Sequence, residues 1–225
     1  MPDPVNDARA VAGHAVLVAG ATSAAGVAVA AALAGAGARV LAVGSDAGRL
    51  ERVRTVAPDA SVYVCDLADF TAVTALAATA HAEHGPIDAL VHLVGGWRGG
   101  GGLDGQSDED WDFLHRRVLQ TLRNTTRAFN ADLLASLAGR LAIVSSVSVT
   151  APTPGGANYA SAKAAAETWT RAVGHGFAKS GDTAAAVIFA VRALEGLESR
   201  LAAEVVSLWD SPAAELNNTR RILTA

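Results

Sequence analysis

The sequence has little cysteine and no concentration of positive charge. Cys65 is the only cysteine among 225 residues, so the chain can form no internal disulfide, which is typical of proteins in the reducing cytoplasm. The 18 lysines and arginines are scattered, and the formal net charge is −4. Nothing in this composition favours nucleic acid or an anionic membrane as a partner. We predict a cytoplasmic protein with no nucleic-acid partner, no membrane partner and no metal site.

Residues 15–38 carry no charged side chain, a run long enough to suggest a membrane span. The run is mostly alanine and glycine, however, and "GATS" at residues 20–23 interrupts it, so a strand, a tight turn and a buried helix explain it better. The first residues include acidic Asp3 and Asp7 and lack the basic start of a secretory signal. We predict one domain over residues 1–225, with a disordered N-terminus at residues 1–13.

Apolar strands and helices alternate along the chain. Apolar runs predict strands at residues 14–20, 38–44, 61–66, 87–96, 140–146 and 184–191, with an edge strand at 220–224. Helices are predicted near residues 24–36, 69–83, 107–136 and 197–209. Two more are predicted, one that begins near residue 46 and one that contains "NYASAK" and ends near residue 179. Strands that are apolar throughout are buried on both faces, and helices between them imply a parallel sheet. The predicted fold is α/β: a single Rossmann-like, doubly wound parallel sheet of about seven strands, with helices on both faces.

The first strand is followed by a glycine-bracketed turn, "AGATSAAG", that opens a helix. The free N–H groups and the dipole of a helix start favour the pyrophosphate of a dinucleotide at this place. Ala24 replaces a middle glycine, and its methyl group narrows the approach to a phosphate. The predicted cofactor-binding residues of this turn are Gly20, Thr22, Ser23, Ala24 and Gly26.

The ends of the second and third strands bear on the choice of cofactor. An acidic residue ending the second strand would hold the ribose hydroxyls of NAD, but Gly44 and Ser45 stand there and the acid is delayed to Asp46. This pattern favours NADP, with Ser45 and Arg49 as candidate phosphate partners, and leaves NAD open. Asp66 ends the third strand, where it could bind an adenine amino group or form a turn or helix cap.

"NYASAK" at residues 158–163 places Tyr159 and Lys163 on one helix face, and Ser146 lies 13 positions before Tyr159. Together with the glycine turn and Asp66, this pattern resembles the classical short-chain dehydrogenase/reductase family, over residues 14–225. The resemblance implies Ser146, Tyr159 and Lys163 as catalytic residues. It also implies that Lys163 grips the nicotinamide ribose and that Gly95 belongs to the cofactor site.

The chemistry of these side chains agrees with that role. A free tyrosine has a pKa near 10, and a lysine ammonium nearby would lower it. Tyr159 could then exchange a proton with a carbonyl or alcohol oxygen, while Ser146 donates a hydrogen bond to the same oxygen.

The sequence departs from the family pattern in and around the fourth strand. "HLVG" replaces the family's asparagine-asparagine-alanine-glycine motif, so His92 and Leu93 stand for amides and only Gly95 is retained. Val118 occupies the place of a catalytic asparagine that anchors a water. His115 and Thr121, one turn to either side, are candidate substitutes or plain packing residues.

The segment after the sixth strand also differs. "FAVRALEG" has no proline-glycine pair, and only about ten residues separate Val191 from the last helix, so the usual substrate lid is nearly absent. The loop "GGWRGGGG" at residues 95–102 is a candidate replacement wall. Trp97 would be its apolar contact and Arg98 its contact with an anionic substrate, unless both are ordinary exposed loop residues.

The sequence thus predicts an NAD(P)-dependent oxidoreductase, a ketoreductase that interconverts a carbonyl and a secondary alcohol. Two alternatives remain open: a redox-inactive binding or assembly protein on the same fold, and a non-redox enzyme that reuses Tyr159. By analogy with the family we expect a homodimer or homotetramer.

Overall fold

A seven-stranded parallel sheet forms the centre of the computed structural model, which describes residues 10–224. Its order is β3-β2-β1-β4-β5-β6-β7, with every neighbouring pair parallel. The strands are β1 (Ala15–Ala19), β2 (Arg39–Gly44), β3 (Ser61–Val64), β4 (Ala89–His92), β5 (Arg140–Ser146), β6 (Ala185–Val191) and β7 (Thr219–Ile222). All residues of β1, β4 and β6 are buried, because helices cover both faces of the sheet. The predicted fold is confirmed.

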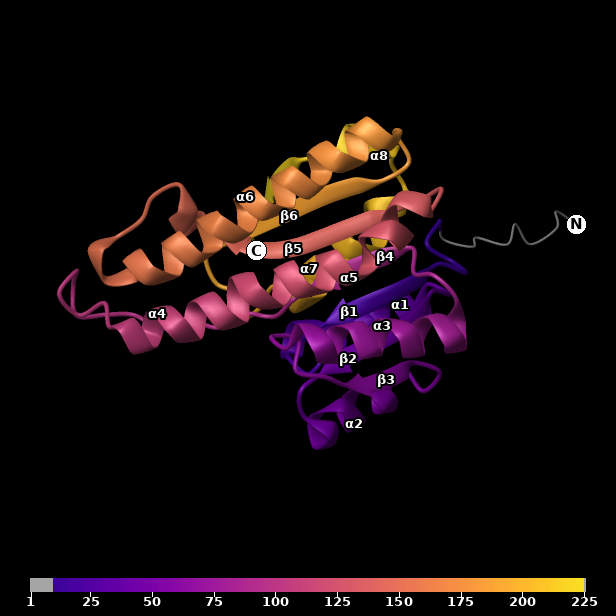
Figure 1. Ribbon diagram of the computed structural model, residues 1–225, viewed down its shortest axis with the longest axis horizontal. Coiled ribbons are helices and arrows are strands. Elements are labelled where there is room, and N and C mark those ends of the chain that lie inside the picture. Colours follow the sequence, from indigo (N-terminus) through magenta and orange to yellow (C-terminus); the bar gives the residue numbers. More distant parts are fainter. Residues whose placement is uncertain (1–9, 225) are drawn as a thin grey trace, which may run out of the picture.

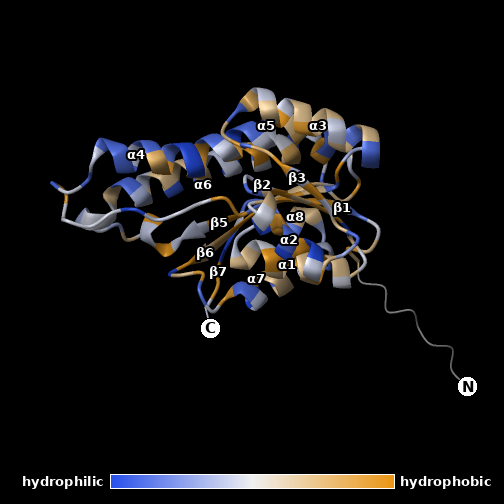
Figure 2. Cartoon of the chain, turned by 90° about the horizontal axis from the view of Figure 1, so that it is seen from below, coloured by the Kyte–Doolittle hydropathy of each residue, from blue (hydrophilic) through white to orange (hydrophobic). Residues whose placement is uncertain are grey.

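Helices form a layer on each face of the sheet (Figure 1, Figure 2). Their bounds are α1 (Ala24–Gly35), α2 (Ala47–Val56), α3 (Phe70–His84), α4 (Asp108–Leu114), α5 (Thr121–Ala135), α6 (Ala157–Ser180), α7 (Glu198–Val206) and α8 (Ala213–Leu216). One layer contains α1, α2 and α7 and the other α3, α5 and α6, so each face of the sheet has its own apolar cluster. Figure 2 shows the apolar strands between the two layers.

Helix starts follow the capping residues in the sequence. The side chains of Ser23, Asp46, Asp69 and Ser107 each accept a backbone N–H of the turn that follows them, which satisfies donors that a helix start leaves free. The helix predicted to begin at Ser107 therefore begins where expected.

The single helix predicted over residues 107–136 is divided in the structure. Residues His115–Gln120 form a π-helix between α4 and α5. Thr121 Oγ donates to the carbonyl oxygen of Arg117 across this segment. A π-helical turn is rare and is frequently found at functional sites. No pattern in the sequence predicts this π-helix, since its residues are ordinary helix formers.

The N-terminal segment and the last crossover complete the fold. Val11 is fully buried and Gly13 N–H bonds to Gly37 O, so the predicted disorder is wrong for residues 10–13, while residues 1–9 lie outside the described residues. The crossover after β6 is short, because α7 begins at Glu198. Within residues 10–224, no helix has the length and apolar character needed to cross a membrane.

Candidate active site

A cavity of about 960 Å³ opens at the carboxyl ends of the central strands. It lies where β1 and β4 are neighbours and the crossovers diverge to opposite faces, the place where open α/β sheets bind ligands. Nine predicted residues line it: Gly20, Thr22, Ser23, Ser45, Asp66, Gly95, Ser146, Tyr159 and Lys163. Ala24 and Gly26, also predicted as cofactor-binding, are not part of its wall.

The turn between β1 and α1 is built so that backbone forms the cavity wall. Gly20 has φ +86°, and a Cβ there would lie 2.9 Å from the carbonyl carbon of Leu93. At Gly26 a Cβ would collide with the carbonyl oxygen of Gly20, so this glycine permits α1 to start close to the turn. Ser23 Oγ accepts the N–H of Gly26 at 3.0 Å. Gly26 therefore supports the backbone of the turn on the side away from the cavity.

At the end of β2 the wall is again free of side chain. A Cβ on Gly44 would lie 2.5 Å from Thr22 Cγ2, so only glycine lets the two turns meet. Asp46 Oδ1 accepts the N–H of Arg49 at 2.8 Å as the cap of α2. The candidate phosphate partner Arg49 is exposed and does not line the cavity, whereas Arg52 reaches the turn and donates to Thr22 O at 2.6 Å.

Asp66 lines the cavity, but both of its oxygens have partners. Oδ1 accepts the N–H of Ala68 at 2.9 Å, which makes the turn that the sequence left as an alternative. Oδ2 accepts from Arg116 Nη2 at 2.7 Å. The cap of α3 is Asp69, three residues later.

Ser146 and Tyr159 meet in the cavity, and a second hydroxyl joins them. Ser146 Oγ lies 2.6 Å from Ser148 Oγ and accepts the N–H of Ser148 at 3.2 Å. Burial raises the pKa of Tyr159, and a hydrogen bond with Ser146 lowers it in part. The expectation that nearby Lys163 lowers the pKa of Tyr159 is wrong in this geometry, because the dominant influence on the phenol is its removal from water.

Lys163 is held by the sheet. Its side chain is only 6% exposed, and its Nζ donates to Val144 O at 2.8 Å and lies 5.9 Å from the centroid of the Tyr159 ring. A Cβ on Gly95 would come within 3.6 Å of Nζ. Burial lowers the pKa of Lys163 to about 8, although the charge of Glu167 raises it. The ammonium can therefore exchange protons near neutral pH.

His92 and Val118 take different roles from the amides they replace. His92, 3% exposed, places Nε2 at 3.1 Å from Thr121 Oγ, and that hydroxyl donates to Arg117 O at 2.7 Å. The imidazole is thus the donor to Thr121. Burial and the charge of Lys163 lower the pKa of His92 to about 3, so the ring is neutral at physiological pH. Val118 is buried in the core cluster that includes α5.

Of the two candidate substitutes for the asparagine, only Thr121 lines the cavity. His115 stacks on Trp111, with 6.1 Å between the ring centroids.

The glycine-rich loop forms one side of the cavity through Trp97, which is 64% exposed. Arg98 pairs with Glu109 and Asp110 at 3.2 and 3.3 Å and is not part of the cavity wall, so its contact with an anionic substrate stays a prediction. Backbone bonds fasten the loop: Gly100 N–H donates to Gly155 O at 2.7 Å.

Gln106 continues this attachment. Its side chain donates to Gly155 O and accepts the N–H of Asn158 at 3.0 Å, beside Tyr159. The loop after β4 is therefore tied to the segment that leads into the Tyr159 helix.

Several polar and charged residues of the cavity wall were not identified from the sequence, among them Ser148, Arg117 and Arg192. Arg117 Nε donates to Gly95 O at 3.0 Å. Arg192 follows Val191, which is paired with Ser146 across the sheet. Ser148 lies in the short 3₁₀ helix Val147–Val149 that follows β5, so the alternation of side chains along a strand does not predict its position. The two arginines had no sequence signal either, because only the packing of the π-helix His115–Gln120 and of the segment after β6 brings them to the cavity.

Comparisons with known proteins agree with this geometry. The family model described as short chain dehydrogenase matches residues 14–194. The chain is 30% identical over 115 residues to 2,3-dihydro-2,3-dihydroxybenzoate dehydrogenase of Bacillus subtilis strain 168, covering 51% of this chain and 44% of the relative. It is 35% identical over 117 residues to oxidoreductase UcpA of Salmonella typhimurium strain LT2, covering 52% and 44%. The matched segment therefore spans less than half the length of these relatives.

A solved structure is similar over nearly the whole chain. A metagenomic short-chain oxidoreductase in complex with NADP superposes with a TM-score of 0.83 at 25% identity, covering 96% of this chain and 99% of the other. The fold, the cavity at the switch point and the family match thus lead to one conclusion. The chain belongs to the short-chain dehydrogenase family of oxidoreductases.

Proposed function

We propose that this protein is an NADP-dependent reductase that interconverts a carbonyl compound and a secondary alcohol. The observation that carries the proposal is the meeting of Ser146, Tyr159 and Lys163 in the cavity that the glycine turn also lines. The volume of about 960 Å³ suits the nicotinamide end of the dinucleotide together with a small substrate. Gly20 and Gly44 both line the cavity without a side chain, which fits the close approach of a phosphate and a ribose to the backbone.

Each side chain has a task in this proposal. Tyr159 gives its proton to the substrate oxygen in reduction and takes it back in oxidation, and its raised pKa keeps it protonated for the first of these tasks. Ser146, oriented by Ser148, donates a hydrogen bond to the same oxygen. When bound, the nicotinamide supplies or accepts the hydride.

Lys163 would contact the ribose hydroxyls and pass a proton toward Tyr159. Its pKa of about 8 supports this task, because the amine then both holds and releases a proton close to neutral pH. Trp97 and the fastened glycine-rich loop would exclude water from the substrate in place of the shortened lid.

The preference for NADP rests on the end of β2. Ser45 lines the cavity where an acid would repel a 2′-phosphate, and the nearest acid, Asp46, is engaged as a helix cap. The similar metagenomic oxidoreductase was solved with NADP. A thermal-shift titration tests this: NADP should raise the melting temperature more than NAD at equal concentration. Equal shifts would remove the preference, and no shift with either would contradict nucleotide binding.

The acid/base role is tested by Tyr159→Phe, assayed with NADPH and a panel of ketones. We expect kcat to fall about 100-fold or more, because the proton donor is lost while the ring is kept. Tyr63→Phe is a matched control, since the chain has only two tyrosines. Tyr63 lies on the edge strand β3, where its hydroxyl bonds to Glu83 of α3. Unchanged turnover in Tyr159→Phe would refute the proposed role.

A further inference from the structure

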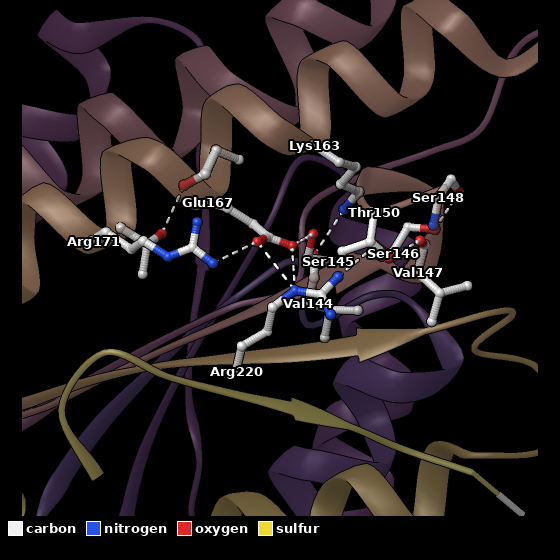
Figure 3. A network of polar contacts seen from close by, with 12 residues as sticks. Val144, Ser145, Ser146, Val147, Ser148, Thr150, Lys163, Glu167, Arg171 and Arg220 are labelled. Atoms are coloured by element: carbon white, nitrogen blue, oxygen red, sulfur yellow. Dashed lines mark hydrogen bonds and ion pairs between the residues drawn. The ribbon is translucent and has the colours of Figure 1, made fainter. Parts of the chain in front are cut away.

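A buried carboxylate lies directly behind the end of β5. Glu167 is 1% exposed and follows Lys163 by one helical turn on α6. Its Oε1 accepts from Ser145 Oγ at 2.7 Å, and Arg220 Nε donates to both carboxylate oxygens at 3.0 and 3.2 Å. Arg171 donates to Oε2 at 3.0 Å from the exposed side (Figure 3). All of these groups donate to the carboxylate oxygens, and the two arginines do so as charged donors.

Arg220 connects this carboxylate to the candidate active site. It extends from β7, and its Nη2 donates to the carbonyl oxygen of Ser146 at 2.9 Å (Figure 3). Lys163 in turn donates to Val144 O at 2.8 Å. Three successive residues at the end of β5 are therefore each bonded to one member of the set Lys163, Glu167 and Arg220.

The charge of Glu167 also acts on Lys163. Glu167 on α6 favours the charged form of Lys163. The charge of Lys163 in turn helps to lower the pKa of His92 on β4. Arg220 and Arg171 face Glu167 itself. A buried ion pair adds little stability compared with apolar side chains of similar size. The pair of Glu167 and Arg220 beside the candidate catalytic residues is therefore better explained by a role other than stability.

We propose that Glu167 and Arg220 are positioning residues: Arg220 fixes the backbone that carries Ser146, and Glu167 holds the charge and place of Lys163. The inference rests on the proposed function, because Ser146 and Lys163 are its reacting groups. Neither positioning residue lines the cavity, so both act through the residues that do.

The lysine content of the chain permits a direct test of Glu167. Lys163 and Lys179 are the only lysines in the sequence, so protein labelled with carbon-13 at the lysine Cε gives two signals by NMR. In Glu167→Gln we expect the titration midpoint of Lys163 to fall by about one pH unit from its value near 8, because an opposite charge is removed. Lys179, exposed on the same helix, is the internal reference.

Arg171→Gln is the matched control for this experiment. Arg171 contacts the same carboxylate without touching Ser146, so both lysine signals should titrate as in the wild type. A Lys163 midpoint in Glu167→Gln equal to that of the wild type would overturn the proposal. The NMR signals do not require turnover, so failure of the proposed reduction would leave this result standing and be seen separately in the ketone assay.

Arg220→Lys tests the second positioning residue and keeps a positive charge for Glu167. It removes the second nitrogen that reaches Ser146, so we expect kcat to fall about tenfold with the KM for NADPH unchanged. Arg171→Gln should keep wild-type kcat. Wild-type kcat in Arg220→Lys, or an equal loss in Arg171→Gln, would overturn the role of Arg220. Because the ion pair with Glu167 is retained, Arg220→Lys tests the role of Arg220 even where Glu167→Gln does not fold.

Discussion

Replacing His92 by glutamine should change how the stability of this protein depends on pH. His92 is 3% exposed, bonds to Thr121 through Nε2, and lies close enough to Lys163 to feel its charge. Burial first, and then the charge of Lys163, lower the pKa of its imidazole from 6.5 to about 3. Glutamine offers an amide donor in place of Nε2 but does not titrate.

The sign and size of the effect follow from linkage. In the unfolded chain His92 takes up a proton as the pH falls through 6.5, while in the folded chain it stays neutral down to about pH 3. Stability is therefore full above pH 6.5 and is lost as the pH falls toward 3. Each pKa unit corresponds to about 1.4 kcal/mol, so the complete loss is about 5 kcal/mol, of which about 2 kcal/mol has occurred at pH 5.

Urea unfolding at pH 7.5 and pH 5.0 measures this difference. Between these pH values the wild type should lose about 2 kcal/mol more free energy of unfolding than His92→Gln. His175→Gln removes an exposed imidazole from α6 and should keep the wild-type pH dependence. If wild type and His92→Gln lose the same free energy of unfolding, His92 is not held neutral in the folded protein and the reasoning is refuted.

Two further predictions concern packing. Gly44→Ala should lower stability by about 1–3 kcal/mol and weaken the thermal shift with NADP, because its Cβ would lie 2.5 Å from Thr22 Cγ2. Gly35→Ala, where a Cβ meets no atom within 4 Å, should instead stabilise α1 by up to about 1 kcal/mol, and urea unfolding compares the two. Phe129→Ala should cost about 3–5 kcal/mol in the same assay, since this fully buried ring of α5 lies in the apolar cluster between α5 and the sheet's strands; a loss under about 1 kcal/mol would contradict that.

Much of the fold could be read from local patterns. Residues 185–191 are apolar throughout, and a strand of that kind must be covered on both faces wherever it lies. Capping residues such as Ser23 and Ser107 mark their helix starts because the donors they satisfy are only two or three residues away. The π-helix at His115–Gln120 could not be read in this way, since its residues carry no local pattern that separates it from the α-helices on either side.

The candidate site also has features that the sequence predicts and features that only the folded structure decides. The spacing of Ser146, Tyr159 and Lys163 is a property of the sequence, and the structure brings all three to the wall of one cavity. The protonation of those side chains is different, because the pKa of Tyr159 is governed by its burial, which no sequence interval records.

The sequence by itself determined the order of strands and helices, the glycine turn and the three candidate catalytic residues, because each of these patterns lies within a short stretch of the chain. The tertiary structure alone decided which charges meet. Glu167 and Arg220 are 53 positions apart, and their contact exists only because β7 is added beside β6. Electrostatic interactions depend on distance in space and on exclusion of water, and both are fixed only when the whole sheet has formed.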